Sequence, residues 1–241
     1  MTRAGPGSGD RAAGVVAIVL AAGEGERIGQ GPKAFLEIGG RTILEIAMQA
    51  AAACPEVSSL VVAVPEGFEA RAAGMAPGPK EVRVIAGGRS RQESVLVALQ
   101  EIPPTVEVVV CHDAARPFAA PELFSSVIAG LAEAEGAISA LAPADTVKRV
   151  GDGFVESTVP RDGLRLAQTP QAFVARVLRE VHLRAAAAGV RSTDDAELLE
   201  WAGHRVRVIA GEPVNFKITS PDDLARAELY VLYPGARATH E

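Results

Sequence analysis

The sequence of 241 residues is poor in aromatic side chains and has no excess of positive charge. Aromatic residues make up 4% of the chain, so we do not expect a surface of exposed rings on which nucleic-acid bases stack. Lysine and arginine number 24 against 30 acidic residues, a formal net charge of −6, whereas proteins that bind nucleic acid generally present a basic surface. These deficits argue against a nucleic-acid partner. Any small anionic ligand must be met by a few local cations.

Cysteines and long apolar runs are also scarce. The two cysteines, Cys54 and Cys111, lie far apart and lack the spacing of metal ligands, which argues against a disulfide framework or a zinc site. The apolar run 15–22 is too short to span a bilayer, and no secretory leader precedes it. We therefore expect a cytoplasmic protein with no membrane partner.

Short apolar segments alternate with helix patterns along most of the chain. β-branched runs with little polar alternation are typical of strands that helices cover on both faces, and S/T-x-x-E capping boxes at Thr42 and Ser90 indicate helix starts. The pattern predicts an α/β fold with a doubly wound, mainly parallel, Rossmann-like sheet. The expected strands are 15–20, 60–64, 82–85, 106–111, 138–141 and 206–209, and the expected helices are about 42–53, 91–101, 121–135, 174–188, 194–202 and 221–232.

One interval breaks this alternation. Two polar, strand-like pieces, Thr146–Val150 and Phe154–Val159, flank a Gly-Asp-Gly turn and predict an inserted β-hairpin arm. An isolated two-stranded ribbon is marginally stable in water, so we expect the arm to lean on a second subunit in a homodimer. The expected organisation is a disordered extension at 1–14, a single domain at 15–233 with the dimerisation hairpin at about 145–165, and a tail at 234–241.

A glycine-rich loop, 21–29, directly follows the first expected strand. Its small residues would let backbone amides approach phosphates, and Arg27 and Lys33 could offset the charge of a triphosphate. The loop lacks the GxxxxGK[ST] pattern of a P-loop, and its third glycine, Gly29, comes one position too late for the GxGxxG dinucleotide fingerprint. From these residues alone, a phosphate-binding loop and an ordinary turn with solvated charges both remain open.

Several further motifs follow this loop in a fixed order. The loop reads A-A-G-x-G-x-R and is followed by P-K; then come G-G-x-x-R-x-x-S-V from Gly87, H-D-A-A-R-P from His112, D-T-V-K from Asp145, T-V-P-R from Thr158, Q-T-P-Q from Gln168, T-D-D from Thr193 and N-F-K-I-T from Asn215. From Val15 to about Tyr233, this series resembles the 2-C-methyl-D-erythritol 4-phosphate cytidylyltransferases of the non-mevalonate isoprenoid pathway. The resemblance implies a sheet of the nucleotide-diphospho-sugar transferase type.

The resemblance also implies a reaction. CMP passes from CTP to 2-C-methyl-D-erythritol 4-phosphate with release of pyrophosphate and without a covalent enzyme intermediate, so catalysis consists of aligning two anions and stabilising developing charge. It implies Mg²⁺ as cofactor and a homodimer whose arm completes the partner's site. The residues expected for catalysis are Arg27, Lys33 and Lys217; for CTP, Ala21, Ala22, Gly23, Gly25, Gly88, Ser94 and Asp113; for the polyol phosphate, Arg116, Thr146, Arg161, Thr193 and Lys217; and for the metal, Asp113.

Asp113 is expected at the carboxyl end of a central strand, where open α/β sheets bind ligands. A carboxylate beside phosphates is repulsive unless a divalent cation bridges them, and the alternative is a loop salt bridge with Arg116. Asp194 and Asp195 are expected to cap a helix rather than bind a metal. His112 is expected to be a neutral, structural imidazole. Because Ser90 begins a helix, a packing role for Arg91 stays open.

Three other functions would share part of this pattern. A ribitol-5-phosphate cytidylyltransferase would share the CTP motifs and differ mainly in its acceptor pocket. A non-catalytic nucleotide-binding regulator is disfavoured. Clustered charges are costly, so a protein that had lost catalysis would be expected to lose them, yet Arg27, Lys33 and Asp113 are all present. A dehydrogenase is excluded by the glycine spacing.

Overall fold

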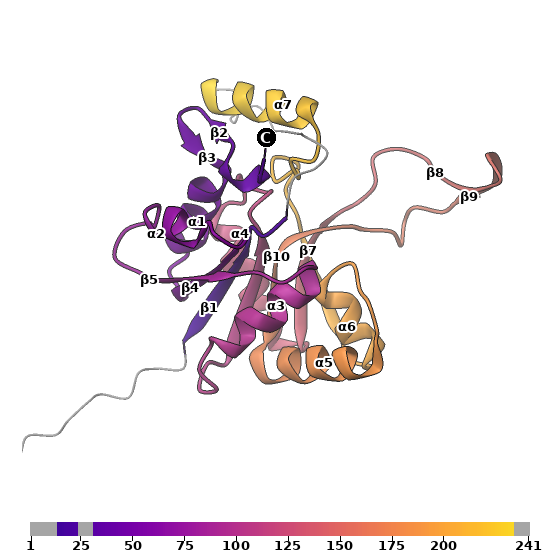
Figure 1. The fold of residues 1–241 in the computed structure, drawn as a ribbon. Helices are drawn as coiled ribbons and strands as arrows, with labels where there is room; N and C mark the ends of the chain where they lie inside the picture. Colours follow the sequence, from indigo (N-terminus) through magenta and orange to yellow (C-terminus); the bar gives the residue numbers. More distant parts are fainter. Residues whose placement is uncertain (1–13, 24–30, 234–241) are drawn as a thin grey trace, which may run out of the picture.

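The computed structural model describes residues 14–23 and 31–233 (Figure 1). At its centre is a seven-stranded sheet in the order β11-β7-β10-β6-β1-β4-β5. Its strands are β1 (Val15–Leu20), β4 (Val57–Val64), β5 (Glu81–Ala86), β6 (Val108–Asp113), β7 (Gly136–Leu141), β10 (Leu166–Val174) and β11 (Val206–Ala210). All neighbours pair in parallel except β10, which is antiparallel to both β6 and β7. The predicted α/β fold with a mainly parallel sheet is confirmed.

Helices cover both faces of this sheet. They are α1 (Ile43–Ala53), α2 (Glu69–Ala73), α3 (Arg91–Gln100), α4 (Pro121–Ala129), α5 (Ala175–Ala188), α6 (Asp195–Trp201) and α7 (Pro221–Leu232), with short 3-10 turns at Lys33–Phe35 and Gly130–Ala132. Alternate residues of β1 enter different cores: Ala17 and Val19 pack with α1 and α4, whereas Val16 and Ile18 pack with α3, α5 and α6. Two apolar layers therefore hold the central strands, as expected for a doubly wound sheet.

A third, smaller core lies outside the main sheet. The short strands β2 (Glu37–Ile38) and β3 (Arg41–Thr42) form a two-stranded sheet, and Ile38 packs with Ala227 of α7 and with Ile218. Ile218 belongs to the N-F-K-I-T motif, so this segment packs with the β2–β3 pair and with α7. Within the described ranges, no helix is both long and apolar enough to cross a membrane.

The helix starts follow the capping signals in the sequence with one difference. Thr42 and Ser220 each form a complete capping box. Ser90 accepts a hydrogen bond from the amide of Glu93, but the Glu93 carboxylate binds the amide of Arg89 instead of closing the box. The expected capping box at Ser90 is therefore only half formed.

The central strand β10 was not predicted. Its sequence contains Gln168, Thr169, Pro170 and Gln171, and it lacks the continuous apolar run by which the other strands were recognised. Its pairing with β7 shifts register between Ala167 and Gln171, which accommodates the proline. The side-chain amides of Gln168 and Gln171 donate, and the hydroxyl of Thr169 bonds, to groups of other segments, whereas the Oε1 of Gln171 is buried without a partner.

Other element boundaries also differ from expectation. Strand β6 continues through His112 to Asp113, so both residues are part of the strand. The helix expected at 121–135 ends at Ala129, and β7 begins earlier than expected, at Gly136. Helix α2 and the β2–β3 pair were not expected.

The predicted hairpin forms as β8 (Val147–Gly151) and β9 (Phe154–Val159), a separate two-stranded sheet that projects away from the body (Figure 1). Asp152 and Gly153 turn the chain in the left-handed region, with φ of 49° and 83°. The tip carries exposed apolar side chains, and Phe154 is 78% and Val155 63% accessible. The arm thus presents apolar surface that the described part of the protomer leaves uncovered.

Candidate active site

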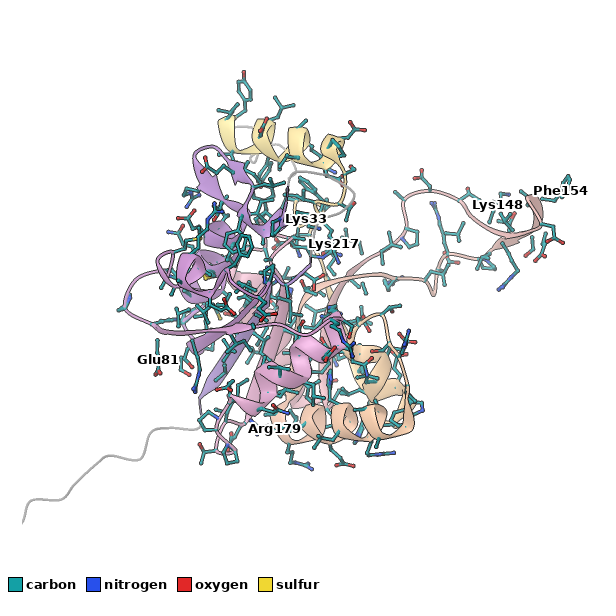
Figure 2. All side chains as sticks on the ribbon, viewed as in Figure 1. Lys33, Glu81, Lys148, Phe154, Arg179 and Lys217 are labelled. Atoms are coloured by element: carbon teal, nitrogen blue, oxygen red, sulfur yellow. The ribbon has the colours of Figure 1, made fainter. Side chains whose placement is uncertain are left out.

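A cavity of about 530 Å³ opens at the carboxyl ends of β1 and β6 and beside the start of α3. This is the edge at which open α/β sheets bind ligands. Figure 2 shows Lys33 and Lys217 together on this side of the molecule, near α7. Residues that line the cavity include Ala21, Ala22, Gly23, Lys33, Gly88, Arg91, Ser94, Asp113 and Lys217. The structure therefore brings together eight of the residues predicted for CTP binding and catalysis, while Gly25 and Arg27 lie outside the described residues.

One wall of the cavity is formed where the loop after β1 meets the loop before α3. A Cβ atom on Gly87 would collide with the Ala22 side chain and would lie 2.9 Å from the Ser94 hydroxyl, so only glycine permits this approach. The Ser94 hydroxyl accepts from the amide of Gly88 at 3.1 Å and donates to the carbonyl of Ser90 at 2.9 Å. Ser94 thus fixes the loop before α3 through its hydroxyl. Its contact with CTP stays a prediction.

Three other residues that line the cavity, Lys217, Asp113 and Arg91, carry charges of alternating sign. The Lys217 ammonium lies 2.7 Å from Oδ2 of Asp113, and the Nε of Arg91 donates to Oδ1 of the same carboxylate at 3.1 Å. Burial opposes the ionisation of Asp113, but the charges of Arg91 and Lys217 outweigh it and hold its pKa below the usual range. Asp113 is therefore an anion bound by two cations, with one oxygen toward Lys217 and one toward α3.

The alternative in which Asp113 pairs with Arg116 is wrong. Arg116 donates to the carbonyl of Asn215 at 2.8 Å and to that of Ala167 at 3.2 Å, and burial lowers its pKa. It does not line the cavity and instead ties the segment before Lys217 to the start of β10. Its predicted contact with the acceptor stays a prediction that this arrangement does not favour.

His112 has the structural role expected of it. The side chain is fully buried, and burial lowers its pKa to about 4, so it is neutral near pH 7. Because the carbonyl of Arg116 can only accept, the Nε2 of His112 donates to it, and Nδ1 accepts from the hydroxyl of Thr169. The same hydroxyl accepts from the amide of Asp113 at 2.9 Å. This chain of bonds fixes the backbone on either side of the Asp113 carboxylate.

The residues predicted for the acceptor do not all meet within one protomer. Thr146 and Arg161 lie on the exposed arm, where Arg161 donates to the carbonyl of Ala144. Thr193 donates to the Glu197 carboxylate at 3.0 Å, and the Asp194 carboxylate accepts from the amide of Glu197, which caps α6. None of these side chains lines the cavity of its own protomer.

Sequence reasoning misplaced one residue and missed several others. Asp195 was expected to cap α6, but only Asp194 does so; Asp195 is 1% accessible and pairs with Arg91 and His182. Gln168, Thr169 and Asn215 belong to the short motifs but were assigned no role, yet they are buried and hydrogen-bonded together, and Thr169 accepts from the amide of Asp113. The signal that could have indicated their burial is the presence of several amide and hydroxyl side chains within the motifs Q-T-P-Q and N-F-K-I-T.

The acidic side chains give little support for a metal site built by the protein alone. Over residues 14–23 and 31–233, no group of three or more His, Cys, Asp or Glu residues could hold an ion, and Asp113 is the acidic residue that lines the cavity. Each oxygen of Asp113 has lone-pair capacity beyond its one cationic partner. One carboxylate fits the usual mode of Mg²⁺, which takes one or two carboxylates and fills its shell with phosphate and water.

Comparison with known proteins agrees with this geometry. Residues 15–232 match the family model of 2-C-methyl-D-erythritol 4-phosphate cytidylyltransferase. The protein of that name from Synechocystis sp. is 40% identical over 216 residues, which cover 88% of this chain and 94% of the relative. A bifunctional enzyme IspD/IspF from Chelativorans sp. is 42% identical over 226 residues, which cover 89% of this chain and 54% of the relative. The chain thus spans about half of this bifunctional relative and nearly all of the Synechocystis one.

Solved structures are similar over the same extent. The 4-diphosphocytidyl-2C-methyl-D-erythritol synthase of Anaerococcus prevotii superposes with a TM-score of 0.83 at 31% identity and covers 91% of this chain and 96% of its own. The 2-C-methyl-D-erythritol 4-phosphate cytidylyltransferase of Thermus thermophilus has a TM-score of 0.77 at 35% identity and covers 91% and 99%. The similarity therefore extends over both the sheet and the cavity.

Proposed function

The chain belongs to the 2-C-methyl-D-erythritol 4-phosphate cytidylyltransferase family, and on this premise we propose how its cavity transfers CMP from CTP to 2-C-methyl-D-erythritol 4-phosphate. The protein is a nucleotidyltransferase of the non-mevalonate route to isoprenoid precursors. The products are 4-diphosphocytidyl-2-C-methyl-D-erythritol and pyrophosphate, and we place the reaction in the cytoplasm.

The observation that carries the proposal is the convergence of Lys33, Lys217 and Asp113 in one cavity at the carboxyl edge of the sheet. A phosphate oxygen of the acceptor attacks the α-phosphorus of CTP, a new P–O bond forms, and the bond to the departing pyrophosphate breaks. Both reactants are anions, so the barrier depends on bringing them together and on stabilising charge around the α-phosphorus. Lys33 and Lys217 supply positive charge from two sides, and Arg27 is proposed to join them from the loop after β1.

CTP is proposed to lie across the small residues of the cavity. Ala21, Ala22 and Gly23 offer a backbone without bulky side chains against which a nucleotide can lie closely. Gly88, held by Ser94, presents the edge that faces the base. Gly25 is assigned to the same loop on the strength of the motif.

The cation is proposed to be Mg²⁺, held by Asp113 and by oxygens of the triphosphate. A divalent cation is general among these nucleotidyltransferases, and Asp113 is the carboxylate available for it in the cavity. When bound, the ion neutralises phosphate charge and orients the triphosphate. Asp113 itself binds Lys217 through Oδ2 and Arg91 through Oδ1, so each cation has its own oxygen of the carboxylate.

The acceptor site is proposed to be completed across a homodimer. Thr146 and Arg161 lie on an arm that extends from the body, and its tip has exposed apolar side chains at Val150, Phe154 and Val155. Burial of such a patch against a second copy stabilises both the arm and the dimer. Thr193, at the start of α6, is proposed to bind the acceptor from the protomer that supplies Lys217.

The proposal is tested by incubation of the purified protein with CTP, Mg²⁺ and either 2-C-methyl-D-erythritol 4-phosphate or ribitol 5-phosphate. Pyrophosphate release and the CDP-alcohol are measured together. We expect both products with the methylerythritol phosphate; turnover with ribitol 5-phosphate alone would overturn the choice of acceptor. CTP binding without product in either reaction would indicate a nucleotide-binding regulator.

Lys33→Ala is the sharpest single variant for this proposal. Loss of a charge that stabilises the transition state typically raises the barrier by at least about 2 kcal/mol, so kcat is expected to fall by roughly 30-fold or more. Lys80→Ala, a lysine substitution outside the residues that line the cavity, is the matched control and is expected to leave kcat unchanged. Equal kcat in the Lys33 variant and the wild type would remove Lys33 from the mechanism.

A further inference from the structure

A line of ionic and hydrogen-bonded side chains runs from the cavity into the interior of the protein. It begins at Lys217, passes through Asp113 and Arg91, and ends at Asp195 and His182. The outer members are partly exposed and the inner ones are buried: the side chains of Lys217, Asp113 and Arg91 are 40%, 11% and 24% exposed, whereas those of Asp195 and His182 are 1% and 0% exposed. Neither Asp195 nor His182 is among the residues that line the cavity, and Asp195 is joined to that lining through Arg91.

The guanidinium of Arg91 joins two carboxylates. Its Nε donates to Oδ1 of Asp113 at 3.1 Å, and its Nη2 lies 2.8 Å from Oδ2 of Asp195. The planar fork of arginine can contact two anions at once in a fixed geometry, which the single ammonium of lysine cannot do. Arg91 thus sets the plane of the Asp113 carboxylate, with Oδ1 turned toward α3 and Oδ2 left facing Lys217.

Arg91 needs such an anchor because of where it lies. It is the first residue of α3, and the positive end of a helix dipole is an unfavourable place for a cation. It also lines the cavity that is proposed to take a triphosphate, which would attract any free guanidinium. Asp195, the first residue of α6, lies on the interior side of Arg91 and opposes both effects.

Asp195 is itself held in place. The Nε2 of His182, on α5, donates to Oδ1 of Asp195 at 3.0 Å, so one carboxylate oxygen binds the imidazole and the other faces Arg91. Burial raises the pKa of Asp195, but the charge of Arg91 and the bond to His182 overcome this and lower it to about 2. Asp195 is an anion throughout the neutral range. Replacement of a buried ion pair by apolar residues is often neutral or stabilising, so the pair is weak evidence for a purely stabilising role.

We propose that Asp195 is a positioning residue for CMP transfer: by holding Arg91 back in the interior, it fixes the carboxylate of Asp113, and through Asp113 the ammonium of Lys217, in the arrangement that the reacting phosphates meet. This inference rests on the proposed function. Asp195 touches no reactant and acts only through Arg91.

A double-mutant cycle tests this proposal. Asp195→Asn keeps the size of the side chain and an oxygen that can accept from His182, but removes the charge that holds Arg91. We expect kcat to fall by about tenfold or more while the KM for CTP changes by less than about threefold. In an Asp113→Asn background, assayed at enzyme concentrations that give measurable turnover, Asp195→Asn should lower kcat by less than about twofold further.

The cycle separates positioning from damage to the fold. A merely structural defect reduces the fraction of active protein, so its effect would multiply with that of Asp113→Asn; multiplied effects, or wild-type kcat in Asp195→Asn, would overturn the proposal. Asp194→Asn is the matched control, since it makes the same change one residue away, keeps a good helix cap and loses no contact with Arg91. Its kcat is expected to equal that of the wild type.

A measurement without substrate completes the test. In ¹⁵N-labelled protein, the Arg91 Nε–H signal, assigned by its loss in Arg91→Lys, is expected to exchange slowly with water in the wild type and at least about tenfold faster in Asp195→Asn. Slow exchange in both proteins would overturn the anchoring role even if turnover fell. This measurement needs no reaction. Absence of CMP transfer in the wild type would therefore count against the proposed function, while the exchange rates would still test whether Asp195 anchors Arg91.

Arg91→Lys carries the test should Asp195→Asn fail to fold. Lysine retains the positive charge at a partly exposed position but cannot contact both carboxylates. The same loss of kcat, and the same absence of a further loss in the Asp113→Asn background, are expected. Wild-type kcat in Arg91→Lys would show that the link between Asp195 and Asp113 does not matter for the reaction.

Discussion

Lys217 and Asp113 form an ion pair at 2.7 Å across a separation of 104 residues, which joins the segment before α7 to the end of β6. If a triphosphate binds in the cavity as proposed, we expect the ammonium to gain a second anionic partner while Asp113 keeps its hydrogen bond to Arg91. The pair therefore holds a cation ready beside the phosphates without leaving it as a bare charge in the empty cavity.

Lys217→Met is expected to lower kcat/KM for the polyol phosphate by at least about 30-fold, which corresponds to about 2 kcal/mol of lost charge stabilisation. Methionine keeps much of the length of the side chain and removes its charge. Steady-state kinetics with each substrate varied in turn provide the measurement. Lys80→Met is the control, and equal kcat/KM in Lys217→Met and Lys80→Met would exclude Lys217 from the site.

Gly87→Ala is expected to impair CTP binding. The added methyl group would collide with Ala22 and would lie 2.9 Å from the Ser94 hydroxyl, so the loops that wall the cavity must separate. We expect the KM for CTP to rise by about tenfold, with a smaller change in the KM for the acceptor. Gly74→Ala, whose added methyl would make an ordinary 3.4 Å contact with the carbonyl of Arg71, is the matched control. An unchanged KM for CTP would show that this close approach is unrelated to nucleotide binding.

Most of the fold could be predicted from the sequence because most of its strands are apolar on both faces. β1, β4 and β6 were recognised from continuous Val, Ile and Leu runs, which report burial directly. β10 could not be recognised, because the side chains of Gln168 and Thr169 are buried by virtue of hydrogen bonds to segments far away in the chain. Single-sequence patterns do not contain those partners.

In the site, too, the motifs identified residues but did not identify the partners that these residues contact. The motifs correctly brought Lys33, Asp113 and Lys217 to one cavity. The sequence offered its near neighbour Arg116 only as an alternative partner of Asp113, and it did not indicate the partner that the structure shows, Arg91, 22 residues earlier in the chain. The fold places the end of β6 beside the start of α3, and this proximity in space decides which charges pair. Proximity in the sequence does not reveal it.

The neutral state of His112 predicts how stability depends on pH. Burial lowers its pKa to about 4 from 6.5, so between these values the unfolded chain takes up a proton that the folded protein does not. Stability is full above about pH 6.5 and falls as the pH drops toward 4, by about 2 to 3 kcal/mol at pH 4.5. Urea unfolding at about pH 7 and pH 4.5 should show this loss in the wild type and a smaller loss in His112→Asn. The same loss in both proteins would assign it to other groups.

The arm provides a test that depends on where each side chain acts. If Arg161 binds the acceptor in the partner's site, a dimer of one Lys33→Ala and one Arg161→Ala subunit has one site with both residues intact and one site with neither. Random exchange makes about half of the dimers mixed, so about one quarter of the wild-type activity should return at low acceptor concentration.

The experiment mixes the two variants at equal concentration under conditions that allow subunits to exchange, and compares CDP-alcohol formation with that of each variant alone. Arg161→Ala by itself is expected mainly to raise the KM for the acceptor, which is why the assay is run below that KM. Each variant mixed with itself is the control. No recovery, once mixed dimers have been demonstrated by mass, would mean that Arg161 serves the site of its own protomer or none, because only action across the interface can restore an intact site from two damaged chains.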